Sequence, residues 1–390
     1  MATPIRETSP GFGLYVHWPF CLSLCPYCDF NSYLARDVDH ARWRDALLAE
    51  LDHFAARTGR CALTSIFFGG GTPSLMAPET IGAVIARARE RFDLAADAEI
   101  TMEANPTSVE AGRLAACRDA GINRVSLGVQ SLDPDALAFL GRKHSAAEAI
   151  AAVETARGLF DRVSLDLIYA RPGQTAKDWR AELERALQLA GGHISVYQLT
   201  IEEGTPFHTQ HARGDFRLPA ERGAVALWQA TQDVLGAAGL PAYEISNHAR
   251  PGEACRHNLT YWRLGDWIGI GPGAHGRLTL DGTLLATRQT AVPAAWLAAV
   301  EKDGHATREE TVIGRDEIRD ELVTMGLRLT DGIARDRFRA RLGAEPEDAL
   351  DASRLGRLVA GGFVVLDAVG LRATPAGLRR LDAVLGALVG

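Results

Sequence analysis

The 390-residue chain has no run of about 18 or more apolar residues, which is the length that a membrane-spanning helix requires. Its first residues, MATPIRETSPGFG, contain no apolar core of the kind found in secretory signals. An excess of positive charge is also missing, because the formal net charge is -7. We therefore expect a cytoplasmic protein that binds no nucleic acid and that reaches a membrane only through a partner protein.

Cysteine is scarce, with six residues in the whole chain, and this number is too small and too unevenly spread for a disulfide scaffold. Three of the six cysteines nevertheless fall within eight residues, as Cys21, Cys25 and Cys28 of the stretch CLSLCPYC. In a reducing compartment such a tight group of thiols indicates a metal site.

Short apolar runs alternate with amphipathic helical stretches from residue 13 to about residue 200. Such alternation predicts repeated β–α units, and therefore a parallel sheet or barrel. The predicted strands are Leu14–Trp18, Ser65–Phe68, Glu99–Glu103, Arg124–Val129, Val163–Tyr169 and Ile194–Leu199.

Polar residues recur at or near the ends of these predicted strands. FFGGGTPS follows the second strand and TMEANP contains the end of the third, while Gln130, Asp166 and Gln198 lie in or next to the later ones. A (β/α) barrel builds its site from the carboxyl ends of many strands, whereas a doubly wound sheet uses one switch point. We therefore predict an α/β fold with a partial, TIM-like (β/α)6 barrel.

The chain changes character towards its C-terminus. Residues 220–240 predict a helix, residues 241–300 are less regular, and the tail predicts helices followed by a hairpin in GFVVLDAVGLRATPAG. We expect a partial-barrel domain that carries the metal site over residues 1–300 and a winged-helix-like α+β domain over 301–390. Residues 311–390 hold 12 arginines and 12 acidic residues, so this domain is expected to pack against a partner rather than bind DNA.

Three closely spaced thiolates suit one face of a cubane iron–sulfur cluster, whose usual ligands are thiolates. Three ligands for four irons leave one iron open, and catalytic metal sites keep such a position for a substrate. A structural zinc site is the alternative, but it needs a fourth ligand, and the nearest histidine is His17. Spacing alone favours the iron–sulfur cluster.

CLSLCPYC after the first strand and GGGTPS after the second resemble the radical S-adenosylmethionine (SAM) superfamily. This resemblance implies a [4Fe–4S] cluster whose open iron is chelated by the amino and carboxylate groups of SAM. In that superfamily the cluster donates an electron, the sulfonium bond breaks and a 5′-deoxyadenosyl radical forms. The cofactor supplies the difficult chemistry, and the protein supplies orientation and electrostatics.

Further motifs (YVHWPFC, EANP, NRVSLGVQS, LGRKHS, SLDLIY and PGQT) resemble oxygen-independent coproporphyrinogen III oxidase and its paralogues over roughly residues 13–275. The resemblance implies that the SAM and cluster contacts are Tyr15, Tyr27, Gly70, Gly71, Thr72, Glu103, Gln130, Arg142 and Asp166. Each has a plainer interpretation: GGGTP also fits a tight turn, the acidic and amide residues fit solvated loops or caps, and Arg142 fits a surface pair with Lys143.

Two features separate the oxidase from its chaperone paralogues. The oxidase pattern has a fourth cysteine two residues after the third, where this chain has Phe30, and HNLTYW resembles a signature of HemW-type heme chaperones. That resemblance implies heme, client apo-hemoproteins and a possible homodimer, and it leaves open whether the protein is an enzyme. Coproporphyrinogen oxidase activity is the first alternative, and a radical enzyme acting on another substrate is the second.

His257 of HNLTYW is the predicted heme ligand, since a neutral imidazole nitrogen can bind heme iron. In a helix it would share a face with Tyr261, four residues on, and Tyr261 and Trp262 could wall in the macrocycle. The alternative is that these residues pack in the core. One departure from the family pattern is ARPGQT in place of GLPGQT, so that Ala170 and Arg171 are expected to alter the pocket floor.

Overall fold

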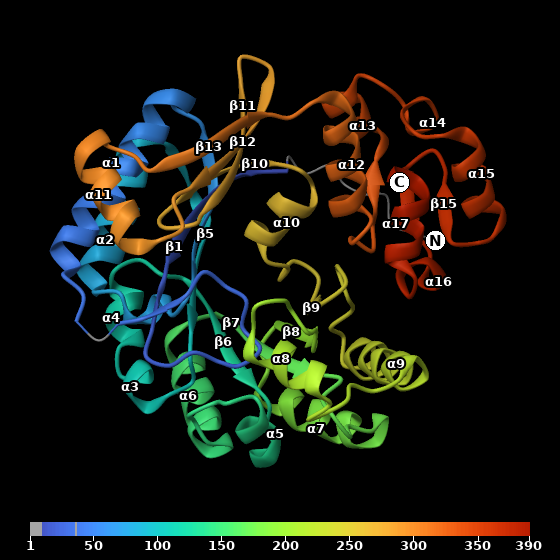
Figure 1. The fold of residues 1–390 in the computed structure, drawn as a ribbon, viewed down its shortest axis with the longest axis horizontal. Coiled ribbons are helices and arrows are strands. Elements are labelled where there is room, and N and C mark those ends of the chain that lie inside the picture. Colours follow the sequence, from blue (N-terminus) through green and yellow to red (C-terminus); the bar gives the residue numbers. More distant parts are fainter. Residues whose placement is uncertain (1–9, 36) are drawn as a thin grey trace.

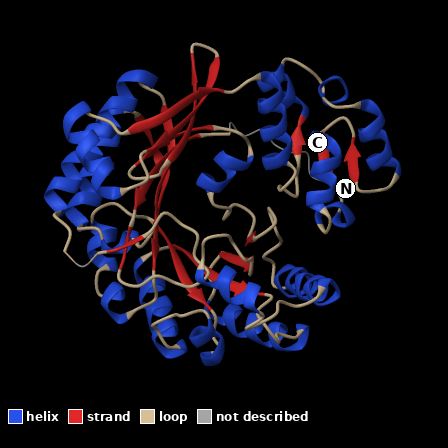
Figure 2. Ribbon diagram, in the orientation of Figure 1, coloured by secondary structure: helices blue, strands red, loops and turns tan. Residues whose placement is uncertain are grey.

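The structure is a computed structural model that describes residues 10–35 and 37–390. Its largest element is an 11-stranded sheet that curves through the molecule (Figures 1 and 2). Seven neighbouring strands are parallel, and in sheet order these are β10 (Asp266–Ile270), β1 (Phe12–Trp18), β4 (Ala62–Gly70), β5 (Asp93–Ala104), β6 (Arg124–Gln130), β7 (Arg162–Tyr169) and β8 (His193–Gln198). The six predicted strands are thus confirmed.

Antiparallel strands extend the sheet at both ends. At one end β9 (Asn247–Ala249) pairs with β8, and at the other β11 (His275–Leu280), β12 (Thr283–Gln289) and β13 (Thr307–Val312) follow β10. The sequence showed no clear pattern for β9 to β12. Because β13 belongs to this sheet, the large domain extends past the predicted boundary at residue 300.

Helices cover the outer side of the curved sheet (Figures 1 and 2). Their buried faces repeat every three or four residues, as Trp179, Leu183 and Ala186 do in α7, because the sheet covers one side of each helix. The helices of this layer are α1 (His40–Thr58), α2 (Pro78–Arg91), α4 (Leu114–Asp119), α6 (Ala146–Leu159), α7 (Ala176–Leu189) and α9 (Glu221–Ala237). Ser145 and Thr175 cap α6 and α7 through their hydroxyls, as such residues do at helix starts.

The remaining elements of the large domain are short. They are β2 (Phe20–Cys21), β3 (Tyr33–Leu34), the 3₁₀ turn η1 (Pro73–Leu75), α3 (Ser108–Ala111), α5 (Pro134–Phe139), α8 (Pro206–Arg213), α10 (Arg256–Trp262) and α11 (Pro293–Asp303). One of them, α10, lies on the inner side of the curved sheet and contacts β1, β4 and β10 (Figure 1). This helix therefore occupies the interior of the open barrel, which further strands would close in a complete barrel.

A buried carboxylate joins α1 to the antiparallel end of the sheet. Glu50 accepts hydrogen bonds from the backbone N–H groups of Gly271 (2.8 Å) and Ala306 (2.9 Å) and from Trp296 Nε1 (3.0 Å). Burial raises the pKa of Glu50 to about 7, although these three donors act in the opposite direction. The indole of Trp296 also stacks on Trp43 of α1.

The C-terminal residues form a small α+β module with its own apolar core. It comprises α12 (Arg315–Gly326), β14 (Ile333–Ala334), α13 (Arg335–Leu342), α14 (Pro346–Ala349), α15 (Ala352–Ala360), β15 (Val364–Leu366), β16 (Gly370–Ala373), α16 (Pro375–Leu378) and α17 (Leu381–Val389). The strands make a three-stranded sheet in the order β14–β16–β15. The predicted helices and hairpin of this tail are confirmed.

Arginines of the module bind the end of α10. Arg337 donates to the carbonyl oxygens of Arg263 (2.7 Å) and Leu264 (2.9 Å), and Arg341 donates to Leu264 as well. Carbonyl groups at the C-terminal end of a helix carry partial negative charge, so cationic side chains are favourable there. Leu264 itself belongs to the apolar core of the module, so α10 is packed between the two domains.

Ala170 and Arg171, the two residues of ARPGQT that depart from the family pattern, are buried in the core. Ala170 has φ +59°, the left-handed conformation that glycine adopts readily. Arg171 forms a buried ion pair with Glu182 of α7 and donates to Ser131. Arg171 does not line the cavity described below, so the expected change to the pocket floor is wrong.

Replacing Arg171 by leucine should destabilise the protein by about 3–5 kcal/mol, because it leaves the Glu182 carboxylate buried without a counter-charge. The double substitution Arg171→Leu/Glu182→Leu should recover most of this loss in a urea or guanidinium unfolding experiment. Arg180→Leu is the control, on the helix that also carries Glu182: its partner Asp233 is exposed, so the loss should stay below about 1 kcal/mol. A double variant as unstable as the single one would contradict this assignment.

Candidate functional site

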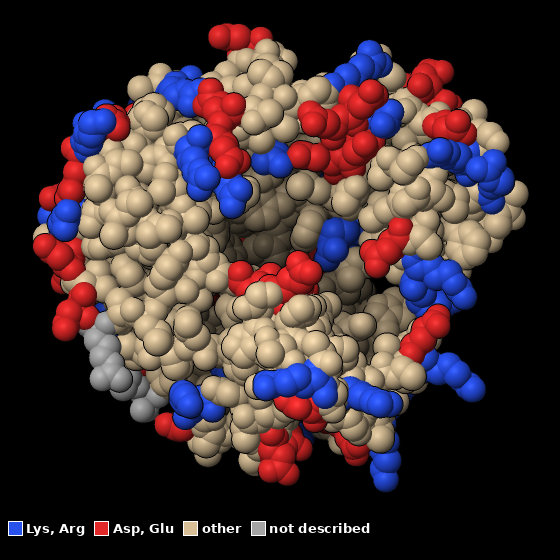
Figure 3. All heavy atoms as spheres, in the orientation of Figure 1, with Lys and Arg blue, Asp and Glu red and all other residues tan. Residues whose placement is uncertain are grey.

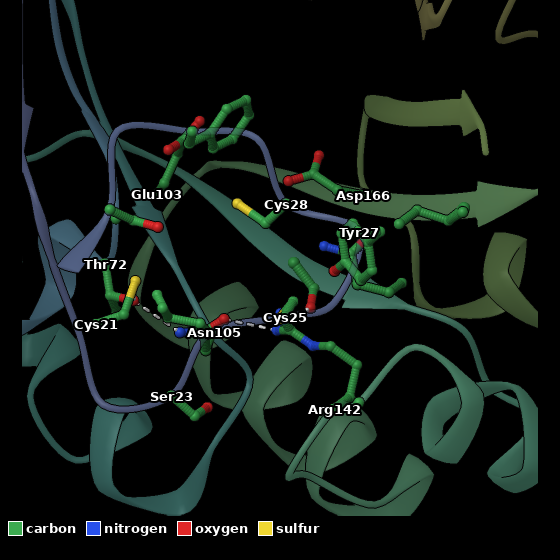
Figure 4. A pocket seen from close by; sticks show the side chains of 18 of the residues that line it. Cys21, Ser23, Cys25, Tyr27, Cys28, Thr72, Glu103, Asn105, Arg142 and Asp166 are labelled. Atoms are coloured by element: carbon green, nitrogen blue, oxygen red, sulfur yellow. Dashed lines mark hydrogen bonds between the residues drawn. The ribbon is translucent and has the colours of Figure 1, made fainter. Parts of the chain in front are cut away.

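A cavity of about 600 Å³ lies at the carboxyl ends of the parallel strands. Its wall is built from the cysteine loop after β1 and from residues that end β4, β5, β6, β7 and β8 (Figure 4). All predicted site residues except Tyr15 and His257 line it. This is the position where a barrel enzyme places its site, since the loops that follow every parallel strand meet there.

The three cysteines reach the cavity from one short loop. They are free and half-buried, and Cys28 N–H donates to the Cys25 carbonyl (3.2 Å) in a tight turn. Burial raises the pKa of the Cys21 thiol to about 11, whereas a bound metal would stabilise the thiolate. Within residues 10–35 and 37–390 no group of three Cys, His, Asp or Glu side chains has the spacing of a preformed metal site.

A chain of hydrogen bonds connects two of the sulfurs. Thr72 Oγ1 donates to Cys21 Sγ (3.3 Å), Asn105 Nδ2 donates to Thr72 Oγ1 (3.2 Å), and Arg142 donates to both Asn105 Oδ1 (2.6 Å) and Cys25 Sγ (3.3 Å) (Figure 4). Donors aimed at sulfur favour the charged thiolate. Asn105 was not singled out from the sequence, although EANP places it immediately after the end of β5.

The glycines of GGGTPS allow β4 to approach the cysteine loop. A Cβ atom on Gly71 would lie 2.8 Å from the backbone of Pro19 and Phe20, and Gly70 has φ +111°. The N–H groups of Gly71 and Thr72 donate to the carbonyls of Trp18 (2.7 Å) and Phe20 (2.9 Å). These two N–H groups are thus already paired within the protein. An ammonium group is a donor, so the carbonyl oxygens of this turn are the groups that can accept hydrogen bonds from it.

Two half-buried carboxylates lie deeper in the cavity. Glu103 accepts from the N–H of Gly70 (3.2 Å), and Asp166 accepts from Ser126 Oγ (2.9 Å). Burial, with added repulsion from Asp166, raises the pKa of Glu103 to about 8, and burial also raises the pKa of Asp166. A cationic ligand would relieve both effects, because it supplies the missing counter-charge.

Gln130, the last residue of β6, combines a strained backbone with an unpaired side-chain oxygen among the described residues. Its φ is +66°, which is uncommon for a side chain of this size, and its Oε1 atom is buried without a hydrogen-bond partner among the residues that the structure describes. Arg142 Nε is buried and unpartnered in the same wall. Unpaired polar atoms in a strained, concave site indicate a ligand-binding role.

The structure does not place Tyr15 in the cavity wall. Its hydroxyl pairs with His17 Nδ1 (3.0 Å), and its ring lies against Phe67 in the interior of the curved sheet. Tyr15 therefore supports the cavity from the layer below. His17 Nε2 pairs with the carbonyl of Asn31 (2.9 Å), so both nitrogens of His17 are occupied and it offers no fourth ligand for zinc.

His257 is also enclosed. It is 1% exposed, and its ring nitrogens pair with Ser65 Oγ (2.9 Å) and Tyr261 OH (2.7 Å). Burial lowers the pKa of His257 to about 3, so the ring is neutral. The predicted shared face of His257 and Tyr261 is confirmed, but no nitrogen of His257 is free to bind heme in this structure. Trp262 faces the C-terminal module, where it stacks against Arg328.

Comparison with known proteins agrees with this geometry. A family model described as the radical SAM superfamily matches residues 15–186, and one described as the HemN C-terminal domain matches residues 313–380. A heme chaperone HemW from Mycobacterium tuberculosis is 38% identical, over 97% of this chain and 95% of its own. The chain belongs to the HemW family of radical SAM proteins.

Other relatives come from both animals and bacteria. A radical SAM domain-containing protein 1 of mouse, named mitochondrial, is 42% identical over 97% of this chain and 88% of its own. Heme chaperone HemW of Escherichia coli is 43% identical over 74% and 76% of the two chains. The structure of coproporphyrinogen III oxidase (HemN) from Escherichia coli shares the fold, with a TM-score of 0.80 at 24% identity over 98% of this chain and 91% of that one.

The HemW family thus implies a [4Fe–4S] cluster and SAM, and the cavity fits both. Three thiols line it, hydrogen-bond donors point at two of the sulfurs, and two carboxylates and an unpaired amide oxygen stand beyond. Thiolates suit the cluster, and the carboxylates suit the sulfonium and ammonium charges of SAM. None of the helices in the described part of the chain is long and apolar enough to span a bilayer.

The affinity for SAM should depend on the ionisation of Glu103. Below its raised pKa, Glu103 is protonated and presents no charge; above it, the carboxylate attracts the cation. The association constant of the wild type for SAM, divided by that of Glu103→Gln, should therefore rise about tenfold between pH 6 and pH 9. A tenfold rise corresponds to a decrease of about one unit in the pKa of Glu103 when SAM binds.

Calorimetry on anaerobically reconstituted protein measures this ratio, which cancels the titration of the amino group of SAM itself. Tyr15→Phe serves as the control and should keep the wild-type pH profile, because burial raises the pKa of Tyr15 and its hydroxyl therefore carries no charge between pH 6 and pH 9. A ratio that stays constant with pH would show that Glu103 does not face the cation.

Proposed function

We propose that this protein is a heme chaperone, which binds heme and passes it to client apo-hemoproteins while holding a [4Fe–4S] cluster and SAM. The observation that supports this most strongly is the 38% identity to a heme chaperone HemW over 97% of the chain. Phe30, where the oxidase pattern has a cysteine, and the HNLTYW segment point the same way.

Within this proposal each cavity residue has a simple task. Cys21, Cys25 and Cys28 hold three irons, and SAM occupies the fourth. The bound cluster supplies one-electron reducing power, while Glu103 and Asp166 balance the charge of SAM. Gln130 Oε1 accepts a hydrogen bond from SAM, and Arg142 orients Cys25 Sγ and the Asn105 amide through its hydrogen bonds to both. Tyr27 encloses the cavity beside Arg142.

Direct ligation of heme by His257 is a separate part of the proposal and has a structural requirement. Both imidazole nitrogens are hydrogen-bonded inside the curved sheet, so α10 must move before either can bind iron. The contacts of α10 with Arg337 and Arg341 would have to break or rearrange in that movement. Otherwise His257 keeps the barrel interior ordered.

Coproporphyrinogen oxidation is the second candidate function, favoured by the shared fold with HemN. It would make the protein an enzyme that carries out two oxidative decarboxylations through a 5′-deoxyadenosyl radical. Phe30 argues against it, since the oxidase pattern places a cysteine there. A homodimer and a cytoplasmic location also remain proposals, and relatives from mouse, cow and zebrafish are named mitochondrial.

Heme titration of the reconstituted protein should give a saturating Soret band at about one heme per chain. His257→Ala should lose this band if α10 opens to expose the imidazole, and should keep it if His257 is only structural. His248→Ala is the matched control, because His248 is another buried histidine of the large domain and lies outside HNLTYW. Absence of saturable binding in the wild type would contradict the chaperone function.

Complementation separates the two candidate functions in the cell. A strain that lacks the oxygen-independent oxidase should not recover anaerobic growth when it expresses this protein. Recovery, together with conversion of coproporphyrinogen III to protoporphyrinogen by the pure protein, would instead support the enzyme.

A further inference from the structure

The cysteine loop carries an unusual group of exposed apolar side chains, here called the apolar rim. Its members are Leu22, Leu24, Phe30 and Leu34, which are 54%, 50%, 60% and 63% exposed. Ten large apolar side chains are exposed in the described residues, and four of them fall within this loop. Isolated exposed leucines are ordinary, but a contiguous group marks a binding surface.

The rim is an ordered part of the structure. Tyr33 N–H donates to the Pro19 carbonyl (2.7 Å), and Ala35 N–H donates to the Cys21 carbonyl (3.3 Å). The short strands β2 and β3 pair so that Leu34 stands directly beside Cys21. These backbone bonds hold the apolar side chains outward, where burial in the core would have been the favourable alternative.

The rim opens onto the cavity that contains the cysteines. Leu22, Leu24 and Phe30 all line this cavity, and Tyr197 of β8, a residue that is 43% exposed, lines it from the strand side. The floor is polar, with Glu103, Asp166 and the hydrogen-bond chain through Asn105, whereas the mouth is apolar. SAM is a small, charged molecule that suits the floor, so the mouth is shaped for a second, apolar ligand.

Charged side chains at the mouth restrict the kind of ligand that fits there. Lys143 is exposed, lines the cavity and forms no ion pair with any residue in the described part of the chain. Asp29 and Glu202 also line the mouth, so its overall charge does not attract anions from a distance. A ligand that is largely apolar and carries a few carboxylates matches this combination, because the apolar area supplies affinity and Lys143 supplies orientation.

A second cavity offers less room than the first. The second cavity lies between α10 and the C-terminal module, is lined by Trp262, Arg263 and Arg337, and measures about 150 Å³. Ligand pockets are typically about 300–1,000 Å³, so this one is too small for a macrocycle. His257 is enclosed. Figure 3 shows charges of both signs interspersed over the viewed face, without a basic stripe.

We propose that heme binds at the mouth of the cysteine cavity, with its macrocycle against the apolar rim and Tyr197 and with a propionate carboxylate near Lys143. This inference rests on the proposed function and assigns a place to its cargo. Phe30 then has a positive role: in the position of the missing fourth cysteine it provides aromatic surface for the macrocycle. Heme held at an open mouth is also accessible to a client.

Rim substitutions should weaken heme binding while leaving the cluster intact. Phe30→Ser should lower heme affinity about tenfold, and Leu22→Ser/Leu24→Ser/Phe30→Ser at least a hundredfold, since each removes apolar contact area. Val292→Ser and Val312→Ser are matched controls, because these valines are equally exposed but lie outside the loop. Both controls should bind heme as the wild type does. Iron content and SAM affinity, measured in parallel, should be unchanged in every variant.

Two modified porphyrins test the contacts more closely. Metal-free protoporphyrin IX should bind the wild type within about tenfold of heme, because the proposed contacts involve the ring rather than the iron. The dimethyl ester of heme should bind more weakly than heme to the wild type, and Lys143→Gln should abolish this difference.

The outcomes separate this inference from the function on which it rests. If the wild type binds no heme, the chaperone function fails. If the wild type binds heme and the rim variants bind it equally well, the function stands and the mouth site is wrong. A loss of dimerisation or client binding in the rim variants, with heme affinity unchanged, would also overturn the proposal and assign the rim to a protein partner.

Discussion

Three thiolates on one loop can ligate only three irons of a cubane cluster, and this shortfall organises the rest of the site. The loop must lie close to the end of β4, which requires the glycines at 70 and 71. Two of its sulfurs need stabilising donors, which Thr72 and Arg142 provide. The remaining space must accept the charges of SAM, and Glu103 and Asp166 face it. Phe30, at the position where the oxidase pattern has a fourth cysteine, is exposed and lines the same cavity.

The curved sheet explains why residues far apart in sequence meet at the cluster. Parallel strands direct all of their carboxyl ends to one edge, so the loops after β1, β4, β5, β6 and β7 converge there. Seven parallel strands do not close a barrel. The helix α10 fills the interior, and the C-terminal module holds it there through Arg337 and Arg341. The module thereby stabilises the barrel without contributing residues to the cavity.

The barrel strands and most cavity residues followed from sequence, because short apolar runs and polar strand ends are local signals. The antiparallel strands β11 and β12 did not, since their pairing depends on the sheet edge that β10 completes. The position of a side chain was harder still. Tyr15 and Gln130 both lie on strands, yet one supports the cavity from below and the other enters it through a positive φ. HNLTYW predicted the helix faces correctly, but only packing shows that His257 points into the core.

With three cysteine ligands, one iron of the cluster is expected to be left for SAM. Mössbauer spectroscopy of the anaerobically reconstituted, 57Fe-labelled protein tests it most directly, because each iron reports its own coordination. Addition of SAM should change the isomer shift of one iron in four and leave the other three unchanged. A spectrum in which all four irons stay equivalent when SAM binds would show that the open position is absent or already occupied by the protein, and would contradict this account.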